Sequence, residues 1–103
     1  MANYLLVYHG GSMAETEEAQ AEVMAAWTTW FTALGPAVVD PGNPASRTKH
    51  IGAGGAVSDD AAGPSGYSII SADSLDAAVE LAKGCPVLGG GSTIQVVETF
   101  AVM

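Results

Sequence analysis

The sequence predicts a single α+β domain, residues 1–103, with a four-stranded antiparallel sheet and two helices. Two stretches have helical spacing of apolar residues, four short runs are rich in β-forming residues, and glycine- or proline-rich breaks separate them. The resulting order is βαββαβ. With right-handed crossovers, this order gives a sheet arranged 4-1-3-2 with both helices on one face.

The central unit is residues 66–88, GYSIISADSLDAAVELAKGCPVL. Residues 67–72 carry apolar side chains on both faces, as in an interior strand. Asp73 is predicted to cap the following helix, with Asp76 completing a capping box. Gly84 is predicted to end that helix as its C′ residue. The helix has an apolar stripe at i, i+3, i+4 and i+7, formed by Leu75, Ala78, Val79 and Ala82.

The N-terminal part predicts a strand and a long helix. Residues 3–9 are apolar on both faces and predict a second interior strand, which glycines and Ser12 break. From about Ala14 to Leu34 the spacing becomes helical, and glutamates crowd the first turn, where they favour the helix dipole. The apolar stripe of this helix, whose tryptophans are expected in the core, consists of Val23, Trp27, Trp30 and Leu34.

The remaining elements are shorter. Residues 37–40 predict a brief strand, and residues 46–51 with 56–58 could form a small hairpin. The last strand is predicted over residues 93–102, with Phe100 and Val102 on its apolar face. Glu98 interrupts that face. We expect a bulge to turn it outward; the alternative is a carboxylate that points into a partly buried space.

Strands that are apolar on both faces leave one face of the sheet without a cover. A second copy of the same sheet is the simplest cover, so the sequence predicts a two-fold homodimer.

Composition excludes several classes of function. Three basic against eleven acidic residues give a net charge of −8, which would repel a nucleic acid. The single cysteine, Cys85, excludes multi-cysteine zinc sites and suits a reducing, cytoplasmic setting. Neither a signal peptide nor a membrane span is readable. Two scattered histidines predict no metal site, and the glycine runs match no phosphate-binding loop, so no cofactor is expected.

The predicted sheet order places a candidate catalytic pair at one rim. His9 ends the first strand, and Asp59 and Asp60 precede the third, so a carboxylate could orient the imidazole as a general base. The alternative is a rim histidine in water. Asp73 lies at the opposite rim and is excluded as the partner. Cys85 follows a helix C-terminus, which raises the pKa of a thiol and argues against a reactive thiolate.

Two segments of the chain resemble the YCII-related family, in particular its DGPF branch. They are residues 66–88, followed by GGSTIQVVETFAVM, and the N-terminal YLLVYHGG. The resemblance implies a ferredoxin-like protomer that pairs as a dimeric α/β barrel. Most members of the family have no assigned function. A few related proteins act on small, often chlorinated aromatic acids without a metal or organic cofactor, using a His and an Asp.

The chain departs from the family pattern in two places. Residues 59–64 read DDAAGP where the branch has DGPF, and Trp27 and Trp30 stand where the wider group often has a histidine.

Three functions follow as hypotheses. The first is a small-molecule binding or regulatory module, with a barrel cavity lined by Tyr8, Trp27 and Tyr67. The second is a cofactor-free lyase, isomerase or dehydrohalogenase that acts on a small acid with His9 as base. The third is an interaction scaffold. His50, in the predicted hairpin, is expected to be exposed.

Overall fold

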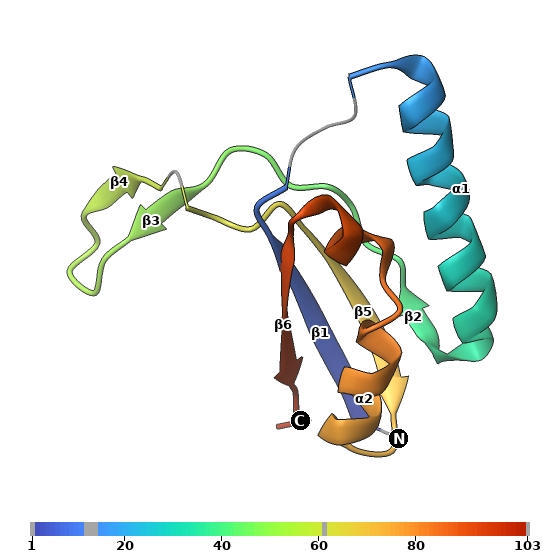
Figure 1. Ribbon diagram of the computed structural model, residues 1–103. Helices are drawn as coiled ribbons and strands as arrows, with labels where there is room; N and C mark the ends of the chain where they lie inside the picture. The colour runs from blue at the N-terminus through green and yellow to red at the C-terminus, as the bar shows by residue number, and fades with distance from the viewer. Residues whose placement is uncertain (1, 12–14, 61, 103) are drawn as a thin grey trace.

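The computed structural model describes residues 2–11, 15–60 and 62–102. The predicted α+β class is confirmed: the structure contains two α-helices and a four-stranded antiparallel sheet (Figure 1). Along the chain, the helices and strands are β1 Ala2–His9, α1 Glu17–Leu34, η1 Gly35–Ala37, β2 Val38–Asp40, β3 Lys49–Ile51, β4 Val57–Asp59, β5 Gly66–Ala72, α2 Leu75–Ala82, η2 Pro86–Gly90 and β6 Thr93–Glu98.

The strands of the sheet lie in the order β2-β5-β1-β6, so β1 and β5 are interior. Counting these four strands in chain order, the sheet reads 4-1-3-2 from the β6 edge. Strands β3 and β4 form a separate two-stranded hairpin that extends away from the sheet (Figure 1). The middle of the sheet therefore has the long apolar strands, and its edges have the shorter or more polar ones.

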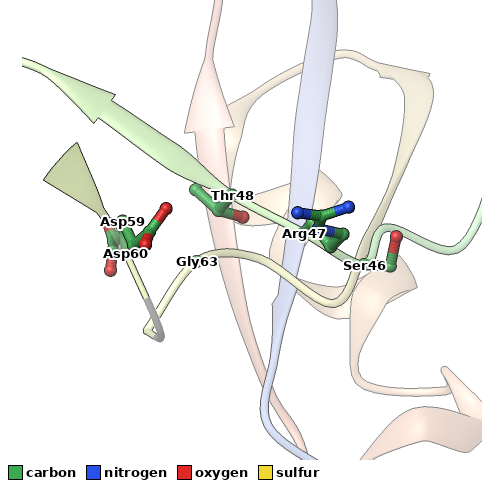
Figure 2. Close-up of a pocket in the computed structure, with 6 residues that line it drawn as sticks. All are labelled: Ser46, Arg47, Thr48, Asp59, Asp60 and Gly63. Atoms are coloured by element: carbon green, nitrogen blue, oxygen red, sulfur yellow. The ribbon is translucent and has the colours of Figure 1, made fainter. Parts of the chain in front are cut away.

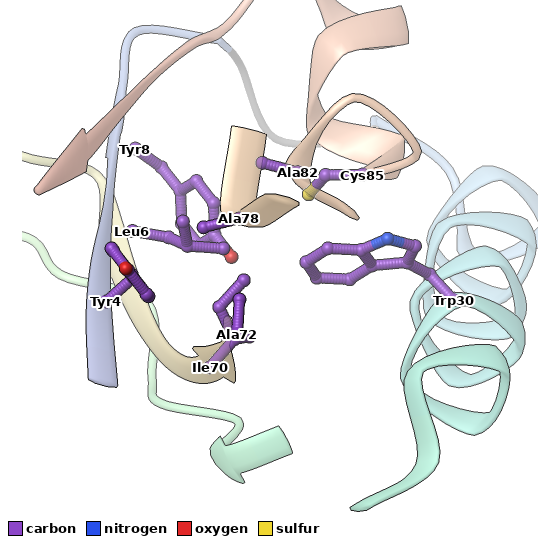
Figure 3. Packing of buried hydrophobic residues seen from close by; sticks show 9 residues of the cluster. All are labelled: Tyr4, Leu6, Tyr8, Trp30, Ile70, Ala72, Ala78, Ala82 and Cys85. Carbon is purple, nitrogen blue, oxygen red and sulfur yellow. The ribbon is translucent and has the colours of Figure 1, made fainter. Parts of the chain in front are cut away.

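The core lies between one face of the sheet and the helices. Alternate residues of β1 and β5 are buried, as the period of two in a strand requires. Tyr4, Leu6 and Tyr8 point to this face from β1, and Ile70 from β5 (Figure 3). Burying a side chain such as Leu6 or Ile70 contributes about 1.5–3 kcal/mol each. The buried cluster is completed by Trp30, Ala72, Ala78, Ala82 and Cys85.

Only the C-terminal half of α1 packs on this core. Trp30 is buried, and the rings of Trp27 and Phe31 pack beside it, with centroids 5.7 and 5.1 Å from that of Trp30. The expectation that the tryptophans belong to the core is confirmed. Val23, predicted on the buried stripe, is 46% exposed, because the first turns of α1 extend past the sheet (Figure 1).

The start of α1 was predicted near Ala14, which lies outside the described residues, as does Ser12. In the structure α1 begins at Glu17, and the side chain of Thr16 accepts a hydrogen bond from the Ala19 amide (3.0 Å). This contact makes Thr16 the N-cap.

The predicted cap of α2 is wrong by one residue. Ser74, rather than Asp73, is the N-cap, and its hydroxyl accepts from the Ala77 amide (3.1 Å). Leu75, predicted on the buried stripe, is 40% exposed, whereas Ala78 and Ala82 are buried. Small residues face the sheet here, so the helix can approach it closely. The residue after the C-cap is Gly84, where an added Cβ would lie 3.3 Å from Trp30 Nε1.

The end of β6 also differs from the prediction. The register of β6 with β1 is continuous from Thr93 to Glu98, so the expected bulge is not formed. Glu98 is exposed because it is the last residue of the strand. Phe100 and Val102, predicted on its apolar face, are 82% and 77% exposed, since the chain leaves the sheet after Glu98.

Candidate functional site

The face of the sheet opposite the helices carries a row of partly exposed apolar side chains. We call it the open face. The register aligns Ile69 of β5, Leu5 of β1 and Val97 of β6 in one row across the sheet. Tyr67, Val7 and Gln95 form the next row. Paired residues on one face lie within contact distance of each other, so these rows form a continuous surface.

Side chains of the open face are partly accessible. Leu5, Val7, Tyr67 and Ile69 are half-buried, and Val97 is 40% exposed. The residues that alternate with them along β1 and β5 are fully buried. A sheet covered on both sides would bury both sets, so one face still lacks a partner.

A polar pair lies at one end of the open face. His9 is half-buried at the end of β1, and its Nε2 lies 2.8 Å from Oε1 of Gln95 on β6. Gln95 is the register partner of Val7, so the two polar residues are diagonal neighbours across the strands. The Gln95 oxygen accepts a hydrogen bond from the Nε2–H group and fixes the imidazole orientation, while the other ring nitrogen keeps its hydrogen-bonding capacity.

The predicted pair of His9 with Asp59 or Asp60 is not brought together within one chain. Asp59 forms an ion pair with Lys49 (Oδ1–Nζ 2.7 Å), and both side chains are mostly exposed. Asp60 accepts a hydrogen bond from the Ala62 amide through its Oδ1 (2.9 Å). No hydrogen bond joins either carboxylate to His9 within the described part of the chain. Both aspartates belong to the projecting hairpin region (Figure 1).

The three aromatic residues predicted to line one cavity lie on two faces of the sheet. Tyr8 and Trp27 pack edge to face in the core, with centroids 5.4 Å apart, and the Tyr8 hydroxyl donates to Ser68 Oγ (2.8 Å). Tyr67 lies on the open face, where its hydroxyl is 3.5 Å from Asn43 Nδ2. Burial raises the pKa of Tyr8 far above its usual value. Tyr8 and Trp27 are therefore structural, and only Tyr67 remains available to a ligand.

Cys85 is buried beside Tyr8 and Trp30 (Figure 3). Burial raises the pKa of its thiol, which keeps it protonated near neutral pH. The direction is the one predicted, although the main cause is desolvation in the core rather than the end of a helix.

Two shallow hollows lie on the projecting hairpin region, and Figure 2 shows the one lined by Asp60 and Gly63. They measure about 460 and 370 Å³ and open widely to solvent. Gly63 allows the chain to pass close to Thr48, since an added Cβ would clash with that side chain. His50 is exposed here, as predicted. The hollows are lined by Ser46, Arg47, Thr48, Lys49, Asp59, Asp60 and Gly63.

Sequence reasoning missed Gln95 as the partner of His9. The residues are 86 positions apart, and the only signal was that the strands predicted over residues 3–9 and 93–102 would be antiparallel neighbours. Side-chain partners across such strands depend on the register, which the sequence left open.

Within the described ranges, neither helix is long and apolar enough to cross a membrane. The same residues contain no cluster of three or more His, Cys, Asp or Glu side chains that could hold a metal ion. Comparison with known proteins adds no relative: no family model, no curated protein and no solved structure matches the chain.

Proposed function

We propose that this protein is a small-molecule-binding module that works as a homodimer. In this proposal each chain is a ferredoxin-like protomer, the open faces of two sheets meet as a dimeric α/β barrel, and a ligand lies between them. The open face, with its row of Ile69, Leu5 and Val97 next to the polar pair His9 and Gln95, is the observation that carries the proposal.

The exposed area supports pairing. The chain exposes 7147 Å² for a mass of 10.4 kDa. A compact monomer of this mass exposes roughly 5,400 Å², so the excess is roughly 1,700 Å² per chain. An interface of standard size buries about 800 Å² per partner. The radius of gyration, 15.1 Å, also exceeds the roughly 13 Å of a compact domain of this length.

The side chains of the open face indicate the class of ligand that it would bind. Aliphatic side chains offer contact to an apolar body, and His9, Gln95 and the Tyr67 hydroxyl offer hydrogen bonds at one end. Pockets for small molecules combine an apolar lining with a few such polar groups. We therefore expect a small molecule with an aromatic or branched aliphatic body and one polar substituent.

Catalysis by His9 is the second candidate, because the contact with Gln95 orients its imidazole. A neutral amide, however, does not stabilise an imidazolium as a carboxylate does, and Asp59 and Asp60 have other partners. This arrangement supports binding over general-base catalysis.

A reducing cytoplasm is the setting we propose for this module, because it suits the buried single thiol of Cys85.

Light scattering coupled to size-exclusion chromatography tests the dimer. We expect the mass of two chains at 50 μM for the wild type and of one chain for Val7→Glu, which places a charge on the open face. Val23→Glu adds the same charge on the exposed part of α1 and should leave the dimer intact. A wild-type mass of one chain at this concentration would refute the proposal.

Ligand binding is tested by ¹H–¹⁵N NMR with two probes, phenol and benzoate, at millimolar concentration. We expect shifts that concentrate on Tyr67, His9 and Gln95. Loss of binding in Val7→Glu, with binding retained in Val23→Glu, would support a site between the sheets. Shifts confined to other residues, or none for either probe, would reject the site. His9→Ala should leave a residual affinity for a binding module and abolish any turnover for an enzyme.

A further inference from the structure

We infer that the projecting hairpin region grips a second copy of this chain. We call the described residues 45–60 and 62–65, which include β3 and β4, the arm. The inference rests on the proposed pairing of two chains and goes beyond it. Each arm contacts the body of the other chain, so that two arms stabilise the dimer in addition to its sheets.

The arm joins the body of its own chain at its base, where the Ser65 amide donates to the Tyr8 carbonyl (2.7 Å), and its two strands lie away from the sheet. Every residue of β3 and β4 is exposed, and these strands pair with each other and not with the main sheet (Figure 1). The arm is closed at its base, where the Ala45 amide donates to the Ser65 carbonyl (2.9 Å) and Pro44 bridges to Gly66. An isolated two-stranded hairpin is marginal in water, so a surface that packs against the arm would stabilise it.

One side of the arm is apolar. Ile51 and Val57 are direct register partners, so they share a face of the hairpin, and they are 68% and 60% exposed. Two paired β-branched side chains in water are a surface suited to protein contact. The roughly 1,700 Å² of excess area per chain exceeds the about 800 Å² that an interface of standard size buries per partner.

Charge identifies the partner as another copy. Outside the arm, the chain has nine of its eleven acidic residues and one of its three basic ones, Lys83, which is paired with Glu80. Within the arm, Lys49 is paired with Asp59, whereas Arg47 forms no ion pair with any described residue. The acidic body of a second copy therefore offers Arg47 the carboxylates that its own arm does not.

A free anion is a poorer occupant of the same place. Asp59 and Asp60 line the hollow that contains Arg47, and only Asp59 is neutralised by an ion pair (Figure 2). Lys49 offsets the charge of Asp59 and Arg47 that of Asp60, so the hollow has no net positive charge to hold a small phosphate or carboxylate. A protein surface can instead reach Arg47 from outside and bury Ile51 and Val57 at the same time.

Replacing residues 46–64 by a short Gly-Ser linker tests the arm, because Ala45 and Ser65 are already in contact. Sedimentation at a series of concentrations should show the dimer Kd rising at least tenfold, with the circular dichroism of the body retained. The double variant Ile51→Glu/Val57→Glu should act in the same direction, whereas Ala53→Glu at the hairpin turn should not.

The outcomes separate this inference from the proposed function. An unchanged Kd in both arm variants, together with a monomeric Val7→Glu, overturns the arm and leaves the dimer of sheets. A monomeric wild type overturns both.

Photo-crosslinking supplies a readout that does not require the dimer to be weakened. Benzoylphenylalanine at position 51 is irradiated in a mixture of ¹⁴N- and ¹⁵N-labelled chains. Crosslinked peptides that combine the two labels are expected and would support the inference. Crosslinks found only within one label would overturn it.

Discussion

Tyr8 connects several parts of the core through its ring and its hydroxyl group. Its ring packs on Trp27, and its hydroxyl donates to Ser68, which in turn donates to the Pro41 carbonyl (2.7 Å). This short relay links β1, β5 and the turn after β2. Buried hydroxyls that lack partners destabilise a fold, and none of the buried side-chain polar atoms among the described residues lacks one.

Burial of Tyr8 and Cys85 predicts a loss of stability at high pH. Their usual pKa values are about 10 and 8.5. Burial raises both in the folded protein, so the unfolded chain releases protons that the folded chain keeps. The free energy of unfolding should keep its full value below about pH 8. It should fall above about pH 8.5 and fall more steeply above about pH 10.

Urea denaturation between pH 7 and 11 measures this profile. In Cys85→Ala the decline should begin only near pH 10, where the two buried tyrosines act, since burial raises the pKa of Tyr4 as well as that of Tyr8. A free energy that stays constant to pH 11 in the wild type would contradict the burial of both groups.

Gly42 is the residue where the backbone leaves least room. Its φ is +76°, and an added Cβ would clash with the carbonyl oxygen of Tyr67 on β5. Gly42→Ala should therefore lower the free energy of unfolding by about 2 kcal/mol or more. Gly54→Ala is the matched control, because its Cβ meets open space, and it should change stability by less than about 0.5 kcal/mol. Equal effects in the two variants would argue against the tight turn.

At the scale of elements, the contrast between the two halves of α1 stands out. From Trp27 onward, its aromatic residues pack on the core, and Trp30 Nε1 donates to the Leu81 carbonyl of α2 (3.2 Å). Before Trp27, Val23 and Met24 are 46% and 66% exposed. Most of the stability of a helix comes from packing, so the second half anchors the first.

Trp30→Ala should lower the free energy of unfolding by about 3–5 kcal/mol, because it removes a buried indole and leaves a cavity. Val23→Ala, on the same helix, should cost less than about 0.5 kcal/mol. Chemical denaturation measures both. Hydrogen exchange should be faster for amides of residues 20–26 than for residues 28–34, and similar protection in both halves would show that another surface covers the first.

At the scale of the molecule, charge and shape have opposite effects on the proposed assembly of two chains. The extents of 43 × 39 × 18 Å describe a flat body with projecting parts, which favours assembly. The net charge of −8 opposes it, since two like-charged chains repel each other. Screening should therefore decide how tight the proposed dimer is at low salt.

Raising NaCl from 10 to 150 mM shortens the Debye length from about 30 to 8 Å. The dimer Kd should fall several-fold over this range, because the repulsion between the two bodies is screened. Analytical ultracentrifugation at fixed pH measures it, with the monomer fraction at each salt concentration as the readout. A dimer that weakens steadily with salt would show that attraction between opposite charges, such as that expected of Arg47, outweighs the net charge.

The positions of most elements could be predicted from the sequence, whereas the candidate site could be predicted only in part. His9 ends β1, the rim position predicted for it, and Tyr67 lies on the open face, while the roles predicted for both remain predictions. The assignments of Tyr8 and Trp27 to a cavity failed, because the two faces of a strand look alike when both are apolar. Asp59 and Asp60 were assigned to a rim, but they lie on an arm whose direction no local pattern encodes.

The sequence by itself determined the α+β class, the number of long strands and helices, and the central strand-to-helix unit. These features depend on periodicity and turn residues within a few positions of each other. Only the tertiary structure decided which sheet face the helices cover, which half of α1 is anchored, and that His9 meets Gln95. Those outcomes depend on register and on the packing of distant segments, and local sequence patterns do not specify either.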